Sequence, residues 1–285
     1  MKILIIGADS LIGKSLSIYL KSDDIIKTTR QKNREHTLEL LYFDLEKSEA
    51  QWPNFPDDID CAFIAASITN QKKCENDPKL AMHVNVTQTI KLIKRLISKN
   101  IHVVFPSTNI VLGCKIPMQH IDEPLSPIGA YALGKAEVEK KFKNNPKVTI
   151  ARLPKVLDCN SGILQKWSDD LIKGNTIEAY NNLKISPVSL DYICHFIKEL
   201  IYQKPTGIWH ISGEREISYC DVAYLLCDKL NIDRKYVIES AMPHSQKAAS
   251  PVHPSLDCSS TKIHLGIPPQ SLSALLEDTI NKIRV

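Results

Sequence analysis

The first twenty residues constrain the fold more than any other segment, because a strand, a tight turn and a helix follow one another without a spacer. Residues 3–6 are all apolar, which is typical of a buried parallel strand, and Gly7 follows them directly. An amphipathic helix that contains Gly13 comes next. Gly7 permits the tight turn, Gly13 lets the helix pack closely on the strand, and the free N–H groups at the helix start suit a pyrophosphate. The segment therefore predicts an opening unit that binds a dinucleotide.

Position 10 departs from the glycine fingerprint of such units. A G-x-x-G-x-x-G motif would have its middle glycine where this chain has Ser10. The Ser10 side chain either caps the helix or adds a hydroxyl to the phosphate site, and the sequence leaves both interpretations open. The substitution weakens the expectation of tight cofactor binding without removing the motif. We expect the cofactor to contact five residues of this turn: Gly7, Ser10, Leu11, Ile12 and Gly13.

Strand and helix patterns alternate along the first half of the chain. We expect strands near residues 2–6, 25–29, 40–43, 60–66, 101–106 and 148–153, and helices near 11–21, 77–98 and 129–144. The alternation predicts an α/β fold, a Rossmann-like doubly wound parallel sheet, with ligands beyond the carboxyl ends of its strands. Prolines punctuate shorter elements after residue 155. We expect a dinucleotide-binding domain over residues 1–155 and a smaller substrate-binding lobe over 156–285, interleaved with the Rossmann core.

Composition fits one modest enzyme. The 285 residues are 43% hydrophobic, and the net charge of +4 is spread along the chain, so a nucleic-acid surface is not indicated. The eight cysteines form no C-x-x-C pair and no secretory leader precedes MKILIIG, which predicts reduced thiols and a cytoplasmic protein. No apolar stretch approaches the roughly 18 residues that cross a bilayer. The nine histidines form no metal-binding pattern, and no metal is expected.

The second expected strand ends in a basic residue. Arg30 stands where an NAD-binding unit has an acid for the adenosine ribose, and Lys32 and Arg34 add positive charge. A guanidinium here can hold a 2′-phosphate through two hydrogen bonds, so NADP(H) is the expected cofactor and NAD(H) the second choice. An ordinary basic loop is the alternative interpretation. Asp44 and Leu45 follow the third expected strand, where a loop can touch the adenine.

A tyrosine and a lysine share one face of the helix expected at 129–144. Tyr131 and Lys135 lie four residues apart, and a positive charge beside a phenol favours the phenolate, which predicts proton transfer near neutral pH. Ser107 and Thr108 come after the preceding strand, where a hydroxyl can bind the same substrate oxygen that Tyr131 protonates. Each pattern is common by itself, on helix surfaces or in turns. Combined with the glycine turn they are much more specific.

These segments resemble the extended branch of the short-chain dehydrogenase/reductase superfamily over nearly the whole chain. GADSLIG matches its glycine motif apart from position 10, AFIAA resembles the strand whose alanines flank the cofactor, and YALGK matches its Tyr-x-x-x-Lys element. CENDPKLAMHVNVTQT resembles a segment that carries an asparagine, here Asn85. PSTNIVLG resembles the Ser/Thr segment, and its alignment through Gly113 assigns the catalytic hydroxyl to Thr108. KISPVSLDYI and HPSLDCSSTKIHLGI resemble stretches of dTDP-4-dehydrorhamnose reductases and related sugar-nucleotide reductases.

The resemblance implies an NADPH-dependent reductase of a keto group on a nucleotide-linked deoxysugar, of the dTDP-4-keto-6-deoxyhexose type. Tyr131 would protonate the developing alkoxide, and Thr108 would fix the carbonyl oxygen. Lys135 would hold the nicotinamide ribose and lower the pKa of the tyrosine. Ala65 and Ala66 would flank the cofactor. Substrate contacts are expected at six residues: Ser67, Thr108, Asn109, Lys155, Trp167 and Ser186.

Two residues depart from the pattern of this branch. Lys155 stands in ARLPKVLD, where many relatives have a small or neutral residue, and its cation either faces a diphosphate or carboxylate in the pocket or extends to solvent. Gly134 stands where a serine or threonine is common. A glycine inside a helix costs about 1 kcal/mol relative to alanine, so we expect another group, with the cofactor as one candidate, to approach this face closely.

Other functions remain open at this point. An NAD-dependent sugar-nucleotide epimerase would use the same triad, although Arg30 argues against it, and a dehydratase is disfavoured because no acidic pair adjoins Thr108. A non-catalytic NADP-binding regulatory subunit is the third function, because proteins similar to this branch include such a subunit of methionine adenosyltransferase. The expected partner is a nucleotide-sugar, with neither nucleic acid nor membrane. In this family the helices expected at 77–98 and 129–144 pair across a dimer contact, so a homodimer is expected.

Overall fold

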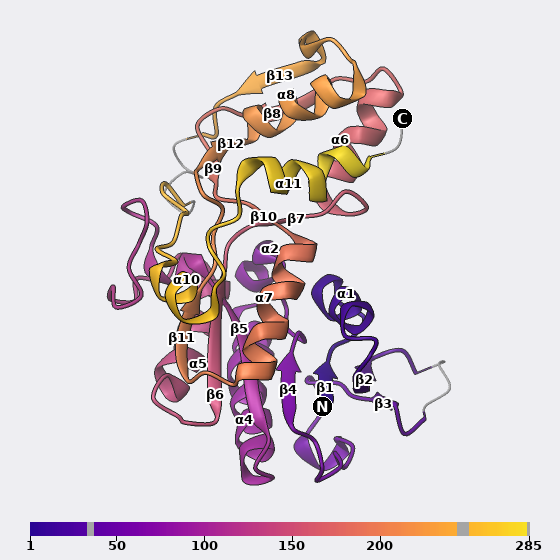
Figure 1. Cartoon of the computed structure of the whole chain (residues 1–285), viewed down its shortest axis with the longest axis vertical. Coiled ribbons are helices and arrows are strands. Elements are labelled where there is room, and N and C mark those ends of the chain that lie inside the picture. Colours follow the sequence, from indigo (N-terminus) through magenta and orange to yellow (C-terminus); the bar gives the residue numbers. More distant parts are fainter. Residues whose placement is uncertain (33–36, 244–250, 284–285) are drawn as a thin grey trace. The chain divides into compact units, whose positions relative to one another are not determined.

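The computed structural model describes residues 1–32, 37–243 and 251–283, and its chain divides into two compact units. Unit 1 comprises Met1–Val111, Pro127–Arg152 and Cys194–Trp209. Unit 2 comprises Leu112–Ser126, Leu153–Ile193 and His210–Val285. Each unit therefore collects segments that are far apart in the sequence, as the mixed colours of the ribbon show (Figure 1).

Unit 1 is built on a seven-stranded sheet with the strand order β11-β6-β5-β4-β1-β2-β3 (Figure 1). The strands are β1 (Lys2–Ile6), β2 (Asp24–Thr29), β3 (Leu40–Tyr42), β4 (Cys61–Ile64), β5 (His102–Thr108), β6 (Val148–Leu153) and β11 (Gly207–His210). β1 pairs in parallel with β2 on one side and with β4 on the other. The chain returns to the middle of the sheet after β3, so the strand order reverses between β1 and β4. In open α/β sheets, ligands bind at the carboxyl ends of the strands beside such a reversal.

Helices connect the strands of unit 1 and flank the sheet. They are α1 (Leu11–Tyr19), α2 (Gln71–Asn76), α3 (Pro78–Met82), α4 (Thr89–Ser98), α5 (Gly129–Phe142) and α7 (Leu190–Gln203), with short 3-10 helices at Glu49–Gln51 and Asn109–Leu112. These elements confirm the expected α/β, Rossmann-like fold. The single helix expected over 77–98 is interrupted, because a π-helical segment, His83–Gln88, separates α3 from α4. Such wider turns inside helices occur frequently at functional sites.

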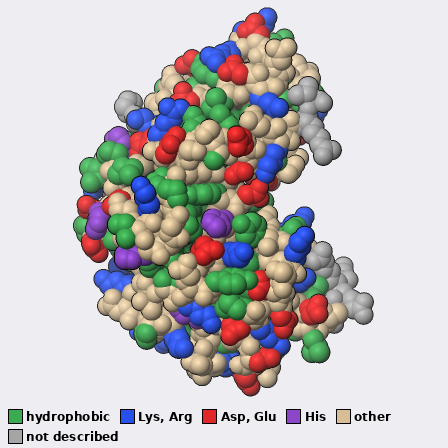
Figure 2. Space-filling model, viewed as in Figure 1, with side chains coloured by type: hydrophobic (Ala, Val, Ile, Leu, Met, Phe, Trp, Pro, Cys, Tyr) green, Lys and Arg blue, Asp and Glu red, His purple; other side chains and the backbone are tan. Residues whose placement is uncertain are grey.

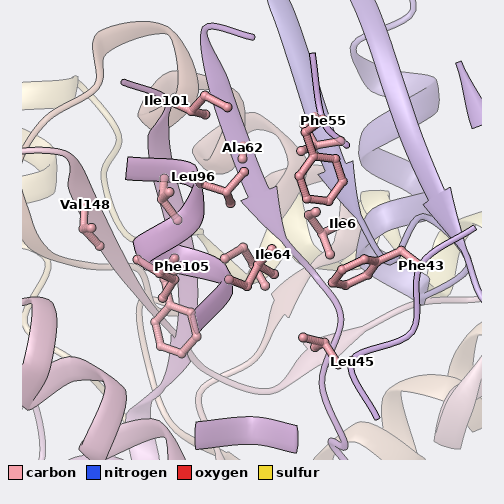
Figure 3. Close-up of a cluster of buried hydrophobic side chains, with 14 of the residues drawn as sticks. Ile6, Phe43, Leu45, Phe55, Ala62, Ile64, Leu96, Ile101, Phe105 and Val148 are labelled. Carbon is pink, nitrogen blue, oxygen red and sulfur yellow. The ribbon is translucent and has the colours of Figure 1, made fainter. Parts of the chain in front are cut away.

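The core of unit 1 forms where the sheet meets apolar side chains from its helices and loops. Figure 3 shows this cluster, in which Ile6, Ala62, Ile64 and Phe105 from three strands lie among side chains from neighbouring segments. The ring of Phe43 lies 5.3 Å from that of Trp52 and 5.8 Å from that of Phe55, measured between centroids. Burying each aromatic side chain contributes a large share of the hydrophobic stabilisation. Leu45 belongs to the same cluster and is only 4% exposed.

Unit 2 contains short strand pairs and a separate core. β7 (Val156–Leu157) pairs with β10 (Val188–Ser189), β8 (Ile177–Tyr180) with β13 (Val237–Ser240), and β9 (Lys184–Ile185) with β12 (Ile217–Ser218). Its helices are α6 (Gly162–Ile172), α8 (Tyr219–Leu230), α10 (Ser259–Leu265) and α11 (Leu272–Asp278), with 3-10 helices at Arg234–Tyr236 and Ile280–Lys282. Its buried cluster draws apolar residues from α6, β8, α8 and β13.

The visible face of the molecule carries charges of both signs. In Figure 2, lysine and arginine side chains are interspersed with aspartate and glutamate rather than gathered by sign. This distribution agrees with the small net charge of +4. Across the residues that the structure describes, no helix has the length and apolar character needed to cross a membrane.

Candidate active site

The turn between β1 and α1 requires a glycine at its first position. Gly7 has a φ of +85°, and a Cβ atom there would lie 2.7 Å from the backbone nitrogen of Ala66. Ser10 is the N-cap of α1: its hydroxyl accepts a hydrogen bond from the N–H of Gly13 at 3.1 Å and donates one to the carbonyl of Gly7 at 2.8 Å. The geometry favours the capping interpretation of Ser10. The Ser10 side chain thus ties the Gly7 and Gly13 ends of the turn together, at the position where the fingerprint has its middle glycine.

A pocket of about 630 Å³ opens beside this turn, entirely within unit 1. Its size lies within the usual range for small-molecule sites. Eight residues expected at the cofactor or substrate line it: Gly7, Ser10, Arg30, Asp44, Leu45, Ala65, Ala66 and Ser67. They follow β1, β2, β3 and β4, so the pocket lies at the carboxyl ends of these strands. Leu11, Ile12 and Gly13 belong to α1 and are not among its lining residues.

The end of β2 places carboxylates close to the expected phosphate-binding arginine. The Arg30 side chain is 70% exposed, and its guanidinium lies 3.7 Å from Oε1 of Glu46. The carboxylate of Asp9, in the glycine turn, accepts hydrogen bonds from the Thr29 hydroxyl and from the N–H of Arg30. Asp9, Asp44 and Glu46 all line the pocket with Arg30. Asp9 and Glu46 were not among the residues expected here, although an acid inside a phosphate-binding turn is visible in the sequence. Arg34, which was expected to add positive charge, lies outside the described residues.

Lys135 is buried beside Tyr131, the tyrosine of the same Tyr-x-x-x-Lys motif. Its side chain is 3% exposed, and its ammonium donates a hydrogen bond of 2.8 Å to the carbonyl of Pro106. The same nitrogen lies 4.6 Å from the ring centroid of Phe105 and 5.8 Å from that of Tyr131. Burial lowers the pKa of Lys135 to about 8, and the Glu139 carboxylate one turn further along α5 opposes this shift. The helix thus places a phenol and an ammonium together on one face.

The expected direction of the tyrosine pKa is wrong. Burial raises the pKa of Tyr131 well above its ordinary value instead of lowering it. Desolvation of the phenolate is the main cause of this rise in pKa, and Cys74 adds to it. Tyr131 is therefore a protonated phenol near neutral pH, which is the form that donates a proton.

The two hydroxyl residues at the end of β5 have different partners. Ser107 donates a short hydrogen bond to the Glu139 carboxylate and is 4% exposed. Thr108, which is 9% exposed, donates to the side-chain oxygen of Asn109 at 3.3 Å. Asn109 begins the 3-10 helix after β5, and α5 contacts β5 directly. Each hydroxyl thus has a partner, and the role of Thr108 as the substrate-binding hydroxyl stays a prediction.

The π-helical segment places Asn85 against the loop after β4. Its side-chain oxygen accepts hydrogen bonds from the Ser67 hydroxyl at 2.9 Å and from the N–H of Ile68 at 2.8 Å, while its amide donates to the Ile68 carbonyl. A Cβ atom on Gly134 would lie 3.4 Å from Val86 and 3.6 Å from Asn85. These are ordinary van der Waals distances, so the packing of α5 on this segment does not itself require a glycine at position 134.

A glutamate from α2 caps the helix that carries Tyr131. Glu75 accepts a hydrogen bond from the N–H of Ala130 at 2.7 Å, through an oxygen that lies 2.7 Å from the position of a Cβ on Gly129. An acceptor at a helix N-terminus satisfies a free donor, and a negative charge there interacts favourably with the helix dipole. The sequence analysis missed this contact because the two residues come from different helices.

Three expected substrate residues lie in unit 2. Lys155 is exposed, yet partial burial lowers the pKa of its ammonium, so both interpretations of this residue stay open. Trp167 is 5% exposed and packs edge-on against Tyr219 in the unit 2 core, with ring centroids 6.3 Å apart. Ser186 is fully buried, and its hydroxyl is hydrogen-bonded to that of Ser212 and to the Gly213 carbonyl. Trp167 and Ser186 thus have packing roles, and we do not include them in the site.

Comparison with known proteins now gives the family. The model of the RmlD substrate-binding domain matches residues 1–285. The chain belongs to this family. Among curated proteins no significant sequence match is found. The expected relationship to the extended short-chain dehydrogenases/reductases of the dTDP-4-dehydrorhamnose reductase type is confirmed, and with it the class of NAD(P)-dependent oxidoreductases.

Solved structures agree with this assignment. A hypothetical dTDP-4-dehydrorhamnose reductase from Sulfolobus tokodaii is 25% identical over 95% of this chain and 97% of its own, with a TM-score of 0.79. A dTDP-4-dehydrorhamnose reductase from Clostridium acetobutylicum is 20% identical over 99% of both chains, with a TM-score of 0.81. A dTDP-glucose 4,6-dehydratase from Streptomyces venezuelae, solved with NAD, is 21% identical over 98% of this chain and 96% of its own, with a TM-score of 0.81. The last two show the shared fold.

For this member of the RmlD family we predict unequal effects of removing the two hydroxyls of β5. If Thr108 binds the oxygen of a keto substrate, Thr108→Ala should lower kcat for its reduction about 100-fold or more, because one donor to the developing oxyanion would be lost. Ser107→Ala is the matched control and is expected to change kcat far less, since its hydroxyl is bonded to Glu139. Steady-state kinetics of both variants test the assignment. A larger loss in Ser107→Ala than in Thr108→Ala would reverse it.

Proposed function

We propose that this protein is an NADPH-dependent reductase of a keto group on a nucleotide-linked deoxysugar. The observation that carries the proposal is the placement of the half-buried Tyr131 and the buried Lys135 on one face of α5, where α5 packs on the strand that ends in Thr108. The cofactor pocket supports it, because α2 and α3 both line that pocket and contact α5. Among the described residues, no group of three His, Cys, Asp or Glu side chains could hold a metal ion.

The residues of the pocket fit a dinucleotide. The Gly7 turn and the N–H groups at the start of α1 would hold the pyrophosphate, and Arg30 would bind the 2′-phosphate of the adenosine ribose. Ala65 and Ala66, which line the pocket, would flank the cofactor. The backbone of Ala66 also packs so closely on Gly7 that no side chain fits there. When bound, the cofactor supplies the hydride.

The chain's own residues would manage the proton and the carbonyl oxygen. Tyr131 donates its phenolic proton to the oxygen as negative charge develops there, and its burial-raised pKa keeps that proton in place beforehand. Thr108 donates a second hydrogen bond to the same oxygen and stabilises the charge. The Lys135 ammonium orients the nicotinamide ribose and stabilises the phenolate left after transfer. Lys155 remains a candidate contact of the substrate in unit 2.

The proposal is tested by a titration with NADPH and NADH, followed by the loss of absorbance at the reduced nicotinamide when dTDP-4-keto-6-deoxyhexoses are added. Oxidation of NADPH with formation of a deoxyhexose alcohol is the expected result. Sugar interconversion by tightly bound NAD, without net oxidation, would replace the reductase by an epimerase. Tight binding of NADP(H) without turnover of any keto-sugar would favour the regulatory subunit.

Arg30→Ala is predicted to separate the two cofactors. Losing a charge-assisted contact with the 2′-phosphate should weaken NADPH binding about 10- to 100-fold, while NADH binding changes little. Glu46→Gln is the matched variant, because it frees the Arg30 guanidinium from a carboxylate 3.7 Å away and should tighten NADPH selectively. Dissociation constants from fluorescence titration provide the measurement. Equal weakening of both cofactors by Arg30→Ala would show that Arg30 does not bind the phosphate.

A further inference from the structure

A charged pair is completely buried beside the Tyr131–Lys135 face. The Arg152 side chain, from β6, is 2% exposed, and the Glu139 side chain, from α5, is 1% exposed. The terminal nitrogen of Arg152 lies 2.8 Å from one Glu139 oxygen, and its Nε lies 3.2 Å from both. Ser107, at the end of β5, donates its hydroxyl to the same carboxylate. One carboxylate therefore links α5, β5 and β6.

The position of this carboxylate connects it to the proposed catalytic residues. Glu139 follows Lys135 by four residues and Tyr131 by eight, so the three share one face of α5. Ser107 is adjacent in sequence to Thr108. Glu139 thus lies one helical turn after Lys135. It also binds Ser107, the residue that precedes Thr108.

A purely structural role explains the pair incompletely. Buried ion pairs often contribute no more stability than well-packed apolar residues of the same size, because desolvation offsets the attraction between the charges. The specific consequence of this pair is a fixed negative charge beside a buried lysine. Without that charge, burial would favour the neutral amine of Lys135.

We propose that Glu139, held by Arg152, is a positioning residue of the active site, which keeps the Lys135 ammonium charged. The catalytic use of Lys135 and Thr108 rests on the proposed function. The electrostatic effect on Lys135 does not, and it can be measured without any substrate.

The surroundings of Lys135 identify the groups that set its charge. Burial lowers its pKa to about 8, and the Glu139 carboxylate is the main group that raises it again, followed by Cys74 from α2. β5 contributes the Phe105 ring and the Pro106 carbonyl, which carry no titratable proton. Tyr131 completes the set on α5, and its phenol is neutral near pH 7 because burial raises its pKa.

The test is a titration of Lys135 by NMR in protein labelled with 13C at the lysine side chains, with its resonance assigned from Lys135→Met. Glu139→Gln keeps the shape of the side chain and removes its charge. This variant is expected to lower the pKa of Lys135 by about one unit or more. The matched control is Glu137→Gln, because Glu137 lies on the same helix but pairs at the surface with Lys140. An unchanged Lys135 pKa in folded Glu139→Gln would overturn the proposal.

A second readout separates this inference from the proposed reductase activity. If reduction requires the Lys135 ammonium, the alkaline limb of the pH profile of kcat/KM should move down in Glu139→Gln by the same amount as the NMR pKa, and remain in place in Glu137→Gln. An NMR shift without a matching kinetic shift would retain the electrostatic effect and remove the catalytic role. No turnover in the wild-type protein would contradict the proposed function and leave the NMR result interpretable.

Loss of folding in Glu139→Gln is addressed by a double variant. Glu139→Gln removes the carboxylate charge that faces the Arg152 guanidinium, whereas Glu139→Gln with Arg152→Met removes both charges of the pair. The double variant is expected to fold and to show the same downward shift of the Lys135 pKa, because Glu139 is the group whose charge acts on the lysine. A wild-type Lys135 pKa in the folded double variant would contradict the proposal.

Discussion

Tyr131→Phe is expected to eliminate reduction almost completely while leaving NADPH binding and the fold unchanged. The substitution removes only the phenolic oxygen, and losing a positioned proton donor lowers the rate about 10²- to 10⁴-fold. The ring that faces the Lys135 ammonium at 5.8 Å is retained. Single-turnover oxidation of NADPH and a fluorescence titration of the cofactor measure the two properties separately.

Tyr219→Phe provides the matched control for this experiment. Tyr219 also has a pKa that burial raises, but its ring packs against Trp167 in the core of unit 2. Turnover by Tyr219→Phe should remain close to that of the wild type. Retained turnover by Tyr131→Phe would remove Tyr131 from the mechanism, whatever the control does.

Arg152→Met is expected to lower the free energy of unfolding by about 3–5 kcal/mol, because the Glu139 carboxylate is left buried without its partner. Replacing both residues by methionine should recover most of this loss, since neither charge of the pair is then left buried without the other. Urea unfolding followed by circular dichroism provides the measurement.

A surface pair on the same helix calibrates the effect of Arg152→Met. Lys140 and Glu137 are in contact at 2.7 Å but are largely exposed, so Lys140→Met should change stability by no more than about 1 kcal/mol. A loss of similar size in Arg152→Met and Lys140→Met would show that the buried pair is not a stabilising unit. A double methionine variant less stable than Arg152→Met would show that the loss comes from packing.

The framework of unit 1 was predictable because its signals are local. An apolar run, a glycine turn and an amphipathic segment suffice to predict β1 and α1, and five further strands lie close to their expected positions. The π-helical segment at His83–Gln88 was not predictable, because a single wider turn between α3 and α4 hardly changes the spacing of apolar residues along the sequence. β11 was also missed, because a four-residue strand so late in the chain has no local sign that it joins the first sheet.

The site shows the same division between local and long-range information. Gly7, Tyr131 and Lys135 belong to short motifs whose spacing fixes their geometry. Glu75 and Glu139 act through partners on other elements, Ala130 and Ser107, which sequence spacing does not reveal. The pKa of Tyr131 was predicted with the wrong sign because the sequence shows the neighbouring charge but not the burial that outweighs it.

Because β11 is synthesised long after the other strands of its sheet, folding during synthesis has to proceed without it at first. The sheet of unit 1 has β11 at one edge, hydrogen-bonded to β6, and this strand ends at His210. A nascent chain that has emerged only as far as β6 therefore presents an edge strand, VTIARL, whose outer side is unpaired. Residues 154–206 must be synthesised before that edge is covered. Truncated products that end within this interval consequently keep that edge open to edge-to-edge aggregation.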